Sequence, residues 1–174
     1  MILPFSTQIN GKPNYFIEKI WLGLLRSHLN LIGYHRFRDE AAINNVIDQW
    51  DIPDSIHPKL HTIREDKTDR WKAGNKIDFF INCRQPTMFR FAPVLPVVSV
   101  QKIEIKWIPL TIPLGERRPW VRIDGKQIYT IDQIDEEQIL QLAQNDGFDT
   151  IEDFFVYFDK DFTGKIIHWT DFRY

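Results

Sequence analysis

Cysteine is almost absent from this chain of 174 residues, and long apolar runs are absent altogether. The one cysteine, Cys83, excludes an internal disulfide framework and fits a reducing compartment. No window approaches the run of about 18 apolar residues that a transmembrane helix needs. The first residues also lack the basic segment and the apolar core of a secretory signal. We therefore expect a soluble, cytoplasmic protein with no membrane partner.

Familiar catalytic and metal-binding motifs are also missing. None of the five histidines stands in an H-E-x-x-H pattern, and a lone cysteine makes no zinc site. There is no G-x-S-x-G elbow and no glycine-rich phosphate loop. Residues 159–164 imitate the start of a calcium loop, but its last ligand position falls on Thr170 instead of a glutamate. We expect no metal and no cofactor.

The composition is that of a globular protein with many aromatic residues. Hydrophobic residues make up 43% of the chain, and its 13 Phe and 6 Trp can fill a core or stack on bases. A net charge of −2 argues against a general nucleic-acid coat protein, which would be basic. The charge is uneven, however, because residues 132–161 hold ten acids against one lysine while residues 100–126 are net basic. A local positive patch is compatible with this pattern.

Apolar periodicity and turn residues predict a succession of strands interrupted by helices. No repeat or long linker separates domains. Asp124-Gly125 predicts a tight hairpin turn, Gly147 a left-handed helix end, and Thr150 a helix N-cap. In chain order we expect a strand at 2–5, helices at 14–25 and 39–50, strands at 76–82, 88–92 and 94–108, a basic loop at 111–119, a hairpin at 121–128, helices at 135–144 and 150–158, and a strand at 164–169.

The segment 57–74 holds the densest group of chemically useful side chains. If it is extended, Thr62 and Arg64 share one face, whereas Lys59 lies on the other and reaches them only if the chain turns near Pro58. A core strand would not carry so many polar groups, since each costs free energy when it is buried without a partner. A solvated edge strand is the plainer interpretation of this pattern.

Lys59-x-x-Thr62-x-Arg64 resembles the K-x-x-T-x-R signature of the ASCH domains, a branch of the PUA-like superfamily. Residues 71–79 are similar to the family's turn into the next strand, and residues 142–158 are similar to its A-x-x-(D/E)-G-F…F helix pair. The resemblance implies an α+β fold, a PUA-like small, mostly antiparallel β-barrel with helices on its rim. The domain would span residues 56–174, with residues 1–55 as an N-terminal helical extension packed on it.

One small branch of these proteins consists of amidohydrolases that deacetylate acetylcytidine. The resemblance implies Lys59 as proton acceptor, Thr62 as nucleophile and Asp146 as proton donor. A lysine that is desolvated near another cation suits the first role, because burial and like charge both lower its pKa. Two departures oppose the transfer: His57 stands where the family commonly has glycine, and Asp146 is one methylene shorter than the family's glutamate.

Three functions remain open, and the first is favoured. It is a non-catalytic pocket for RNA or a modified nucleobase or nucleotide, in which Lys59 and Arg64 hold a phosphate or carbonyl and Trp71 stacks on the base. The second is the amidohydrolase, which requires Lys59, Thr62 and Asp146 to converge on one cavity. The third is a protein-interaction or structural role, in which Arg64 and Asp146 form a buried ion pair.

Overall fold

The computed structural model describes residues 1–174 except 28–30, 48–49, 51–52, 54, 112–114 and 131–135. The described helices are α1 (Phe16–Arg26), α2 (Leu31–Ile43), α3 (Glu136–Asn145) and α4 (Ile151–Tyr157). The described strands are β1 (Ile2–Pro4), β2 (Gln8–Ile9), β3 (Lys12–Pro13), β4 (His61–Arg64), β5 (Lys76–Ile81), β6 (Phe89–Arg90), β7 (Leu95–Pro96), β8 (Ser99–Pro109), β9 (Arg117–Ile123), β10 (Lys126–Tyr129) and β11 (Phe162–His168).

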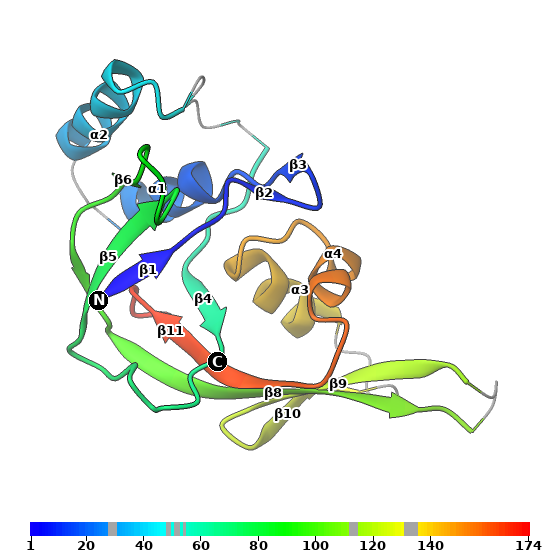
Figure 1. Ribbon diagram of the computed structural model, residues 1–174. Coiled ribbons are helices and arrows are strands. Elements are labelled where there is room, and N and C mark those ends of the chain that lie inside the picture. Colours follow the sequence, from blue (N-terminus) through cyan, green and yellow to red (C-terminus); the bar gives the residue numbers. More distant parts are fainter. Residues whose placement is uncertain (28–30, 48–49, 51–52, 54, 112–114, 131–135) are drawn as a thin grey trace.

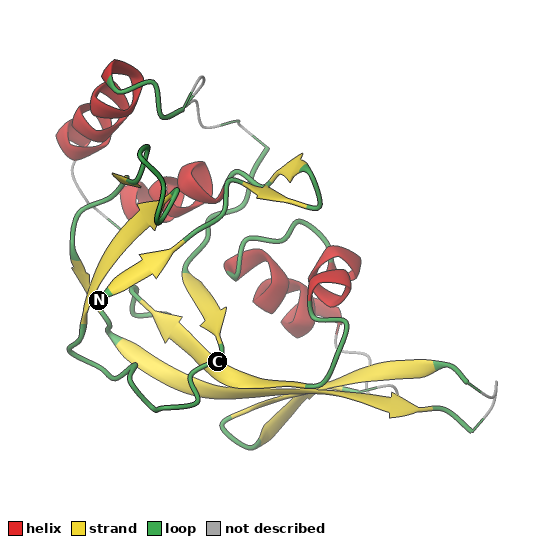
Figure 2. Cartoon of the chain, viewed as in Figure 1, coloured by secondary structure: helices red, strands yellow, loops and turns green. Residues whose placement is uncertain are grey.

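The strands form two main sheets and one small hairpin (Figures 1 and 2). The larger sheet is antiparallel throughout, with the order β10-β9-β8-β11-β4. The smaller sheet has the order β1-β5-β6, with β7 also paired to β5, and β1 runs parallel to β5. The predicted α+β class is confirmed. No sheet closes into a barrel among the described strands.

Two hydrophobic cores flank the middle of the molecule. One lies among β1, α1 and β5 and includes Trp21 and Phe79. The other lies between the larger sheet and helices α3 and α4 and includes Leu142. Successive side chains of β11 point to opposite faces, so Ile166 belongs to the second core and Ile167 to the first. Strands β4 and β11 therefore separate the two cores.

Residues 1–55 are joined to the rest of the chain by strand pairing and by a shared core. Strand β1 pairs with β5 in the register Leu3 to Phe79. In addition, the Lys59 amide donates a hydrogen bond to the carbonyl of Lys19 on α1, at 2.9 Å. None of the described helices is long and apolar enough to cross a membrane.

Several local predictions are confirmed. Asp124 and Gly125 adopt φ values of 49° and 82° in the β9–β10 turn, and Gly147 has a φ of 98° after α3. The Thr150 hydroxyl accepts a hydrogen bond from the Asp153 amide at 3.0 Å, as an N-cap does. The long strand predicted at 94–108 is bent, since β7 ends at Pro96 and β8 begins three residues later.

Two predicted bounds are wrong. The helix expected at 39–50 is α2, which begins at Leu31 and ends at Ile43, because Asn45 takes a left-handed φ of 49° that stops the helix; residues 48–49 of the expected helix lie outside the described chain. The basic loop expected at 111–119 is shorter than expected, because Arg117 already pairs with Pro109 on β8. Residues 112–114 of that loop lie outside the described chain.

Candidate functional site

Strand β4 is an edge strand that carries Thr62 and Arg64 of the K-x-x-T-x-R pattern between the two cores, and Lys59 lies two residues before it. Its register with β11 places Thr62 opposite Ile167 and Arg64 opposite Lys165. Just before the strand, the Leu60 amide donates to the carbonyl of Asn145, at 2.9 Å, at the end of α3. The segment is therefore fixed to α3 by backbone contacts as well as by side chains.

Lys59 and Asp146 form a buried ion pair. Both residues are almost inaccessible, with exposed fractions of 1% and 4%. The Lys59 Nζ lies 2.9 Å from the Asp146 Oδ1 and also donates to the Asp146 carbonyl. The Ile63 amide donates to the same Oδ1 at 2.9 Å. The carboxylate therefore connects β4 to the turn that follows α3.

Burial and pairing act against each other on the pKa values of this pair. Burial lowers the pKa of Lys59 to about 8, although the charge of Asp146 opposes the shift. Burial also acts to raise the pKa of Asp146, but the charge of Lys59 and the bonds from His61 and Lys59 outweigh it, and this pKa lies below its usual value. At neutral pH the pair is ionised.

The turn after α3 closes tightly over the lysine. A Cβ atom added to Gly147 would lie 2.7 Å from the Phe16 ring and 3.0 Å from the Lys59 Cδ. The Lys59 Nζ lies 4.6 Å from the centroid of the same Phe16 ring, within cation–π range. Glycine is needed at position 147 because of this close approach and because of its positive φ.

Thr62 is not brought together with the pair. The His61 ring approaches the Asp146 carboxylate, with Nδ1 at 3.7 Å from Oδ1, so alternation along β4 directs Thr62 toward the opposite face. Thr62 is 2% exposed, and in the part of the chain that the structure describes its hydroxyl makes no hydrogen bond. The structure thus gathers Lys59 and Asp146, the predicted base and acid, without the predicted nucleophile.

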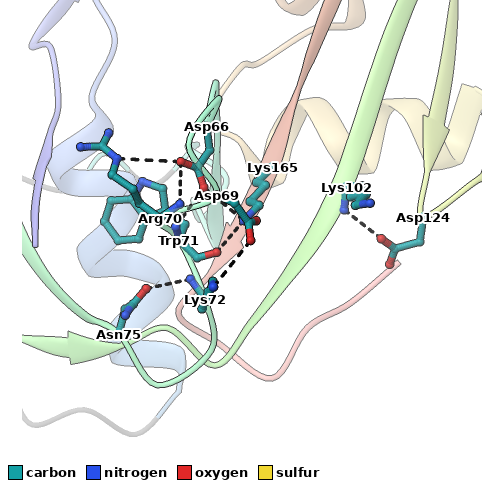
Figure 3. A network of polar contacts seen from close by, with 9 residues as sticks. All are labelled: Asp66, Asp69, Arg70, Trp71, Lys72, Asn75, Lys102, Asp124 and Lys165. Atoms are coloured by element: carbon teal, nitrogen blue, oxygen red, sulfur yellow. Dashed lines mark hydrogen bonds and ion pairs between the residues drawn. The ribbon is translucent and has the colours of Figure 1, made fainter.

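The two predicted substrate-binding residues have structural contacts. The Arg64 Nη2 donates to the Pro4 carbonyl at 2.8 Å, and its guanidinium lies 5.4 Å from the Phe5 ring. Arg64 therefore does not form the ion pair with Asp146 that the third, structural alternative requires, and Lys59 pairs with this carboxylate instead. Trp71 is 6% exposed and belongs to the first core, and its amide donates to Asp66 at 2.9 Å within the network that Figure 3 shows.

A buried polar row beside the ion pair was missed by sequence reasoning. Register places Ser99, His168 and His61 side by side on β8, β11 and β4. The His61 Nε2 lies 2.8 Å from the Tyr174 hydroxyl, whereas neither ring nitrogen of His168 has a hydrogen-bond partner within the described chain. Burial lowers the pKa of His168 to about 3, and the neighbouring His61 adds to the shift. Only strand register reveals this row, and no local sequence pattern encodes it.

A cleft of about 380 Å³ is lined by Phe16, whose ring the Lys59 Nζ also approaches. It is bordered by the β2–β3 hairpin, the start of α1 and the α3–α4 turn, and Phe148 and Asp149 line it together with Phe16. Lys19, also in its wall, donates to the Gly147 carbonyl at 2.8 Å and to the Asp149 Oδ1 at 2.6 Å. Sequence reasoning assigned this helix to core packing and gave no signal for the lysine.

Comparison with protein-family models, with curated proteins and with solved structures finds no match to this chain. Within the described residues, no group of three or more His, Cys, Asp or Glu side chains is arranged to hold a metal ion. The case for a functional site therefore depends on the geometry of the ion pair and of the cleft beside it.

Proposed function

We propose that this chain is an ASCH-like, PUA-like domain that binds a nucleobase or nucleoside, free or within RNA, in the cleft beside Lys59. The observation that carries the proposal is a cleft lined by the edges of two largely buried rings, Phe16 and Phe148, together with the buried Lys19 and exposed polar groups. Aromatic walls hold bases by stacking, and nearby donors and acceptors select among them. The volume of about 380 Å³ lies in the usual range of small-molecule sites.

The charges around the cleft favour an uncharged ligand group. The lining holds two cations, Lys12 and Lys19, and two carboxylates, Asp149 and Asp153, so its charges balance. This lining has no excess positive charge to hold a phosphate, whereas its carboxylates can accept hydrogen bonds from the amino and imino groups of a base. A base or nucleoside therefore fits the cleft better than the phosphate of a nucleotide does.

In this proposal the K-x-x-T-x-R motif does not contact the ligand and instead supports the residues that line the cleft. The ion pair of Lys59 with Asp146 fixes the turn at Gly147, and that turn and the lysine both pack on Phe16. Lys59 is thus a positioning residue that sets the aromatic wall. This role differs from the direct ligand contact that the sequence predicts.

A ligand screen on matched variants tests the proposal. Val156 and Glu152 are both exposed on α4, and only Val156 lines the cleft. We expect one member of a panel of nucleosides, acetylated cytidines and short single-stranded RNAs to raise the melting temperature of the wild type and of Glu152→Trp, but not of Val156→Trp. A shift that survives in Val156→Trp, or no shift with any member of the panel, would contradict the proposal.

An amidohydrolase acting on an acylated nucleoside is the second proposal, favoured by the pKa of about 8 for Lys59. It requires the Thr62 hydroxyl to reach Lys59, which the alternation of β4 opposes. Release of acetate from acetylcytidine, lost in Thr62→Val, would support it. If the wild type binds acetylcytidine and releases no acetate, the domain binds its ligand without hydrolysis.

A further inference from the structure

Helices α3 and α4 cover one face of the five-stranded sheet (Figures 1 and 2). The opposite face carries a group of cations. Along β8 and β9 the residues Ile103, Ile105 and Val121 point into the core. The residues that alternate with them point outward. We call the outward set the basic face, and its members are Lys102, Glu104 and Lys106 of β8, Arg118, Trp120 and Arg122 of β9, Gln127 of β10, and Lys165 of β11.

The basic face holds five cations and one acid among these members. Two of the cations, Lys102 and Arg122, form no ion pair within the described chain. Lys102 stands directly opposite Lys165 in the β8–β11 register, an arrangement of like charges that is unfavourable without a nearby anion. Figure 3 shows Lys165 directed to Asp66 and Asp69, while Lys102 contacts Asp124 through its backbone amide.

The remaining ion pairs on this face are solvent-exposed. Lys106 lies 3.3 Å from Asp161, and Arg118 lies 3.8 Å from Glu116, with all four side chains roughly half exposed. Exposed pairs of this kind contribute little free energy, so a polyanion can compete for their cations. The acids that contact these cations, namely Asp66, Asp69, Glu116 and Asp161, offset most of the charge of the basic face. Among the described residues, Lys102 and Arg122 are its members without an ion-pair partner, and they offer a polyanion its first contacts.

Trp120 and Arg122 form a fixed aromatic and cationic unit within the basic face. The Arg122 guanidinium lies 4.5 Å from the centroid of the Trp120 ring, and the Trp120 indole N–H donates to the Gln127 Oε1 at 2.7 Å. The Arg122 Nε is buried and has no hydrogen-bond partner in the described part of the chain. A half-buried indole stacked against a guanidinium that forms no ion pair in the described chain suits a base next to its phosphate.

We propose that the basic face binds the phosphate backbone of single-stranded nucleic acid, a function distinct from that of the cleft. The net charge of −2 does not oppose this, because α3 and α4, which carry Glu136, Glu137, Glu152 and Asp153, cover the opposite side of the sheet. An anionic membrane is a poorer match. Ile108 is the one large aliphatic side chain on this face that the described chain leaves highly exposed, and interfacial binding needs a larger apolar surface.

Fluorescence anisotropy with a labelled single-stranded RNA of about 12 nucleotides tests the proposal. The test variant is Lys102→Gln/Lys106→Gln/Arg118→Gln, and the matched control is Arg36→Gln/Lys76→Gln/Arg84→Gln, which removes three exposed cations elsewhere. All six positions are exposed, so both proteins are expected to fold, and circular dichroism melting verifies this.

We expect the wild type to bind the RNA with a strong salt dependence between about 50 and about 200 mM salt. The test variant should bind at least about tenfold more weakly, with a salt slope smaller by about 2, because each phosphate contact on a single strand contributes about 0.7. The control should bind like the wild type. No binding by the wild type, equal losses in both variants, or tighter binding to anionic vesicles than to RNA would overturn the proposal.

Two further variants separate this surface from the cleft. Trp120→Ala should weaken RNA binding without a change in the salt slope, since stacking releases no counterions. Val156→Trp obstructs the cleft and should abolish the nucleoside-induced rise in melting temperature, while the salt slope of RNA binding stays that of the wild type. If Val156→Trp abolishes RNA binding while the basic-face variant does not, the cleft holds the RNA and the basic face does not.

Discussion

Acid sensitivity centred on His168 is the sharpest consequence of the buried polar row. His168 is fully buried, and its pKa of about 3 compares with 6.5 in an unfolded chain. As the pH falls below 6.5, the His168 imidazole binds a proton in the unfolded chain but stays neutral in the folded protein. His168 therefore contributes stability that is present above pH 6.5 and is lost progressively as the pH falls toward 3.

The magnitude follows from the two pKa values. Between about pH 7.5 and about pH 5, protonation of the unfolded imidazole stabilises the unfolded chain by about 2 kcal/mol, while the folded imidazole is still neutral. His168→Phe keeps a ring of similar shape and removes the titration. The free energy of unfolding of the variant should therefore fall by about 2 kcal/mol less than that of the wild type over this pH range.

Urea unfolding at several pH values, followed by tryptophan fluorescence, measures this difference. His35→Gln, which removes an exposed imidazole, controls for the loss of a histidine. His61 also has a lowered pKa, caused first by burial, so His61 should leave part of the pH dependence in place in His168→Phe. Parallel pH profiles for the wild type and His168→Phe would refute the reasoning, because they would show that His168 is protonated in the folded protein.

Three further substitutions examine the ion pair and its surroundings. Lys59→Met should lower the free energy of unfolding by about 3–5 kcal/mol in urea, because it leaves the Asp146 carboxylate buried and unpaired; an unchanged midpoint would contradict the pair. Thr62→Val should cost less than about 1 kcal/mol in the same assay, and a larger loss would show that the hydroxyl has a partner. Gly147→Ala should lower the melting temperature more than Gly74→Ala, since both have positive φ but only Gly147 lacks room for a Cβ; equal losses would rule out the close contact.

The local elements were largely predictable because short-range chemistry specifies them. Asp124-Gly125 requires a tight turn wherever it stands, and Thr150 three residues before an acid is a sufficient signal for a helix start. The α+β class followed from the alternation of such elements. The misplaced helix at 39–50 shows the limit, since the apolar spacing there continues past Asn45, where a left-handed residue had already ended the helix.

Long-range partners were not predictable from spacing. Nothing in the sequence pairs β1 with β5 or places Ser99, His168 and His61 in one row, because strand register is decided by the packing of distant faces. Of the contacts considered for the K-x-x-T-x-R residues, that of Lys59 with Asp146 is present and the ion pair of Arg64 with Asp146 is not. The sequence alone allows either Arg64 or Lys59 to pair with Asp146. The alternation of side chains along this segment decides that Lys59 forms the pair.

Because of this alternation, the residues of the motif contact two different parts of the molecule. Lys59 and His61 are directed to the end of α3, whereas Thr62 and Arg64 are directed to the core around β1. A pattern that sequence reasoning interprets as a group of catalytic residues thus connects the two cores through one edge strand. Because the lysine also packs on Phe16, loss of Lys59 is expected to weaken folding and ligand binding together. Ligand binding is therefore better tested at an exposed cleft residue, Val156, than within the motif.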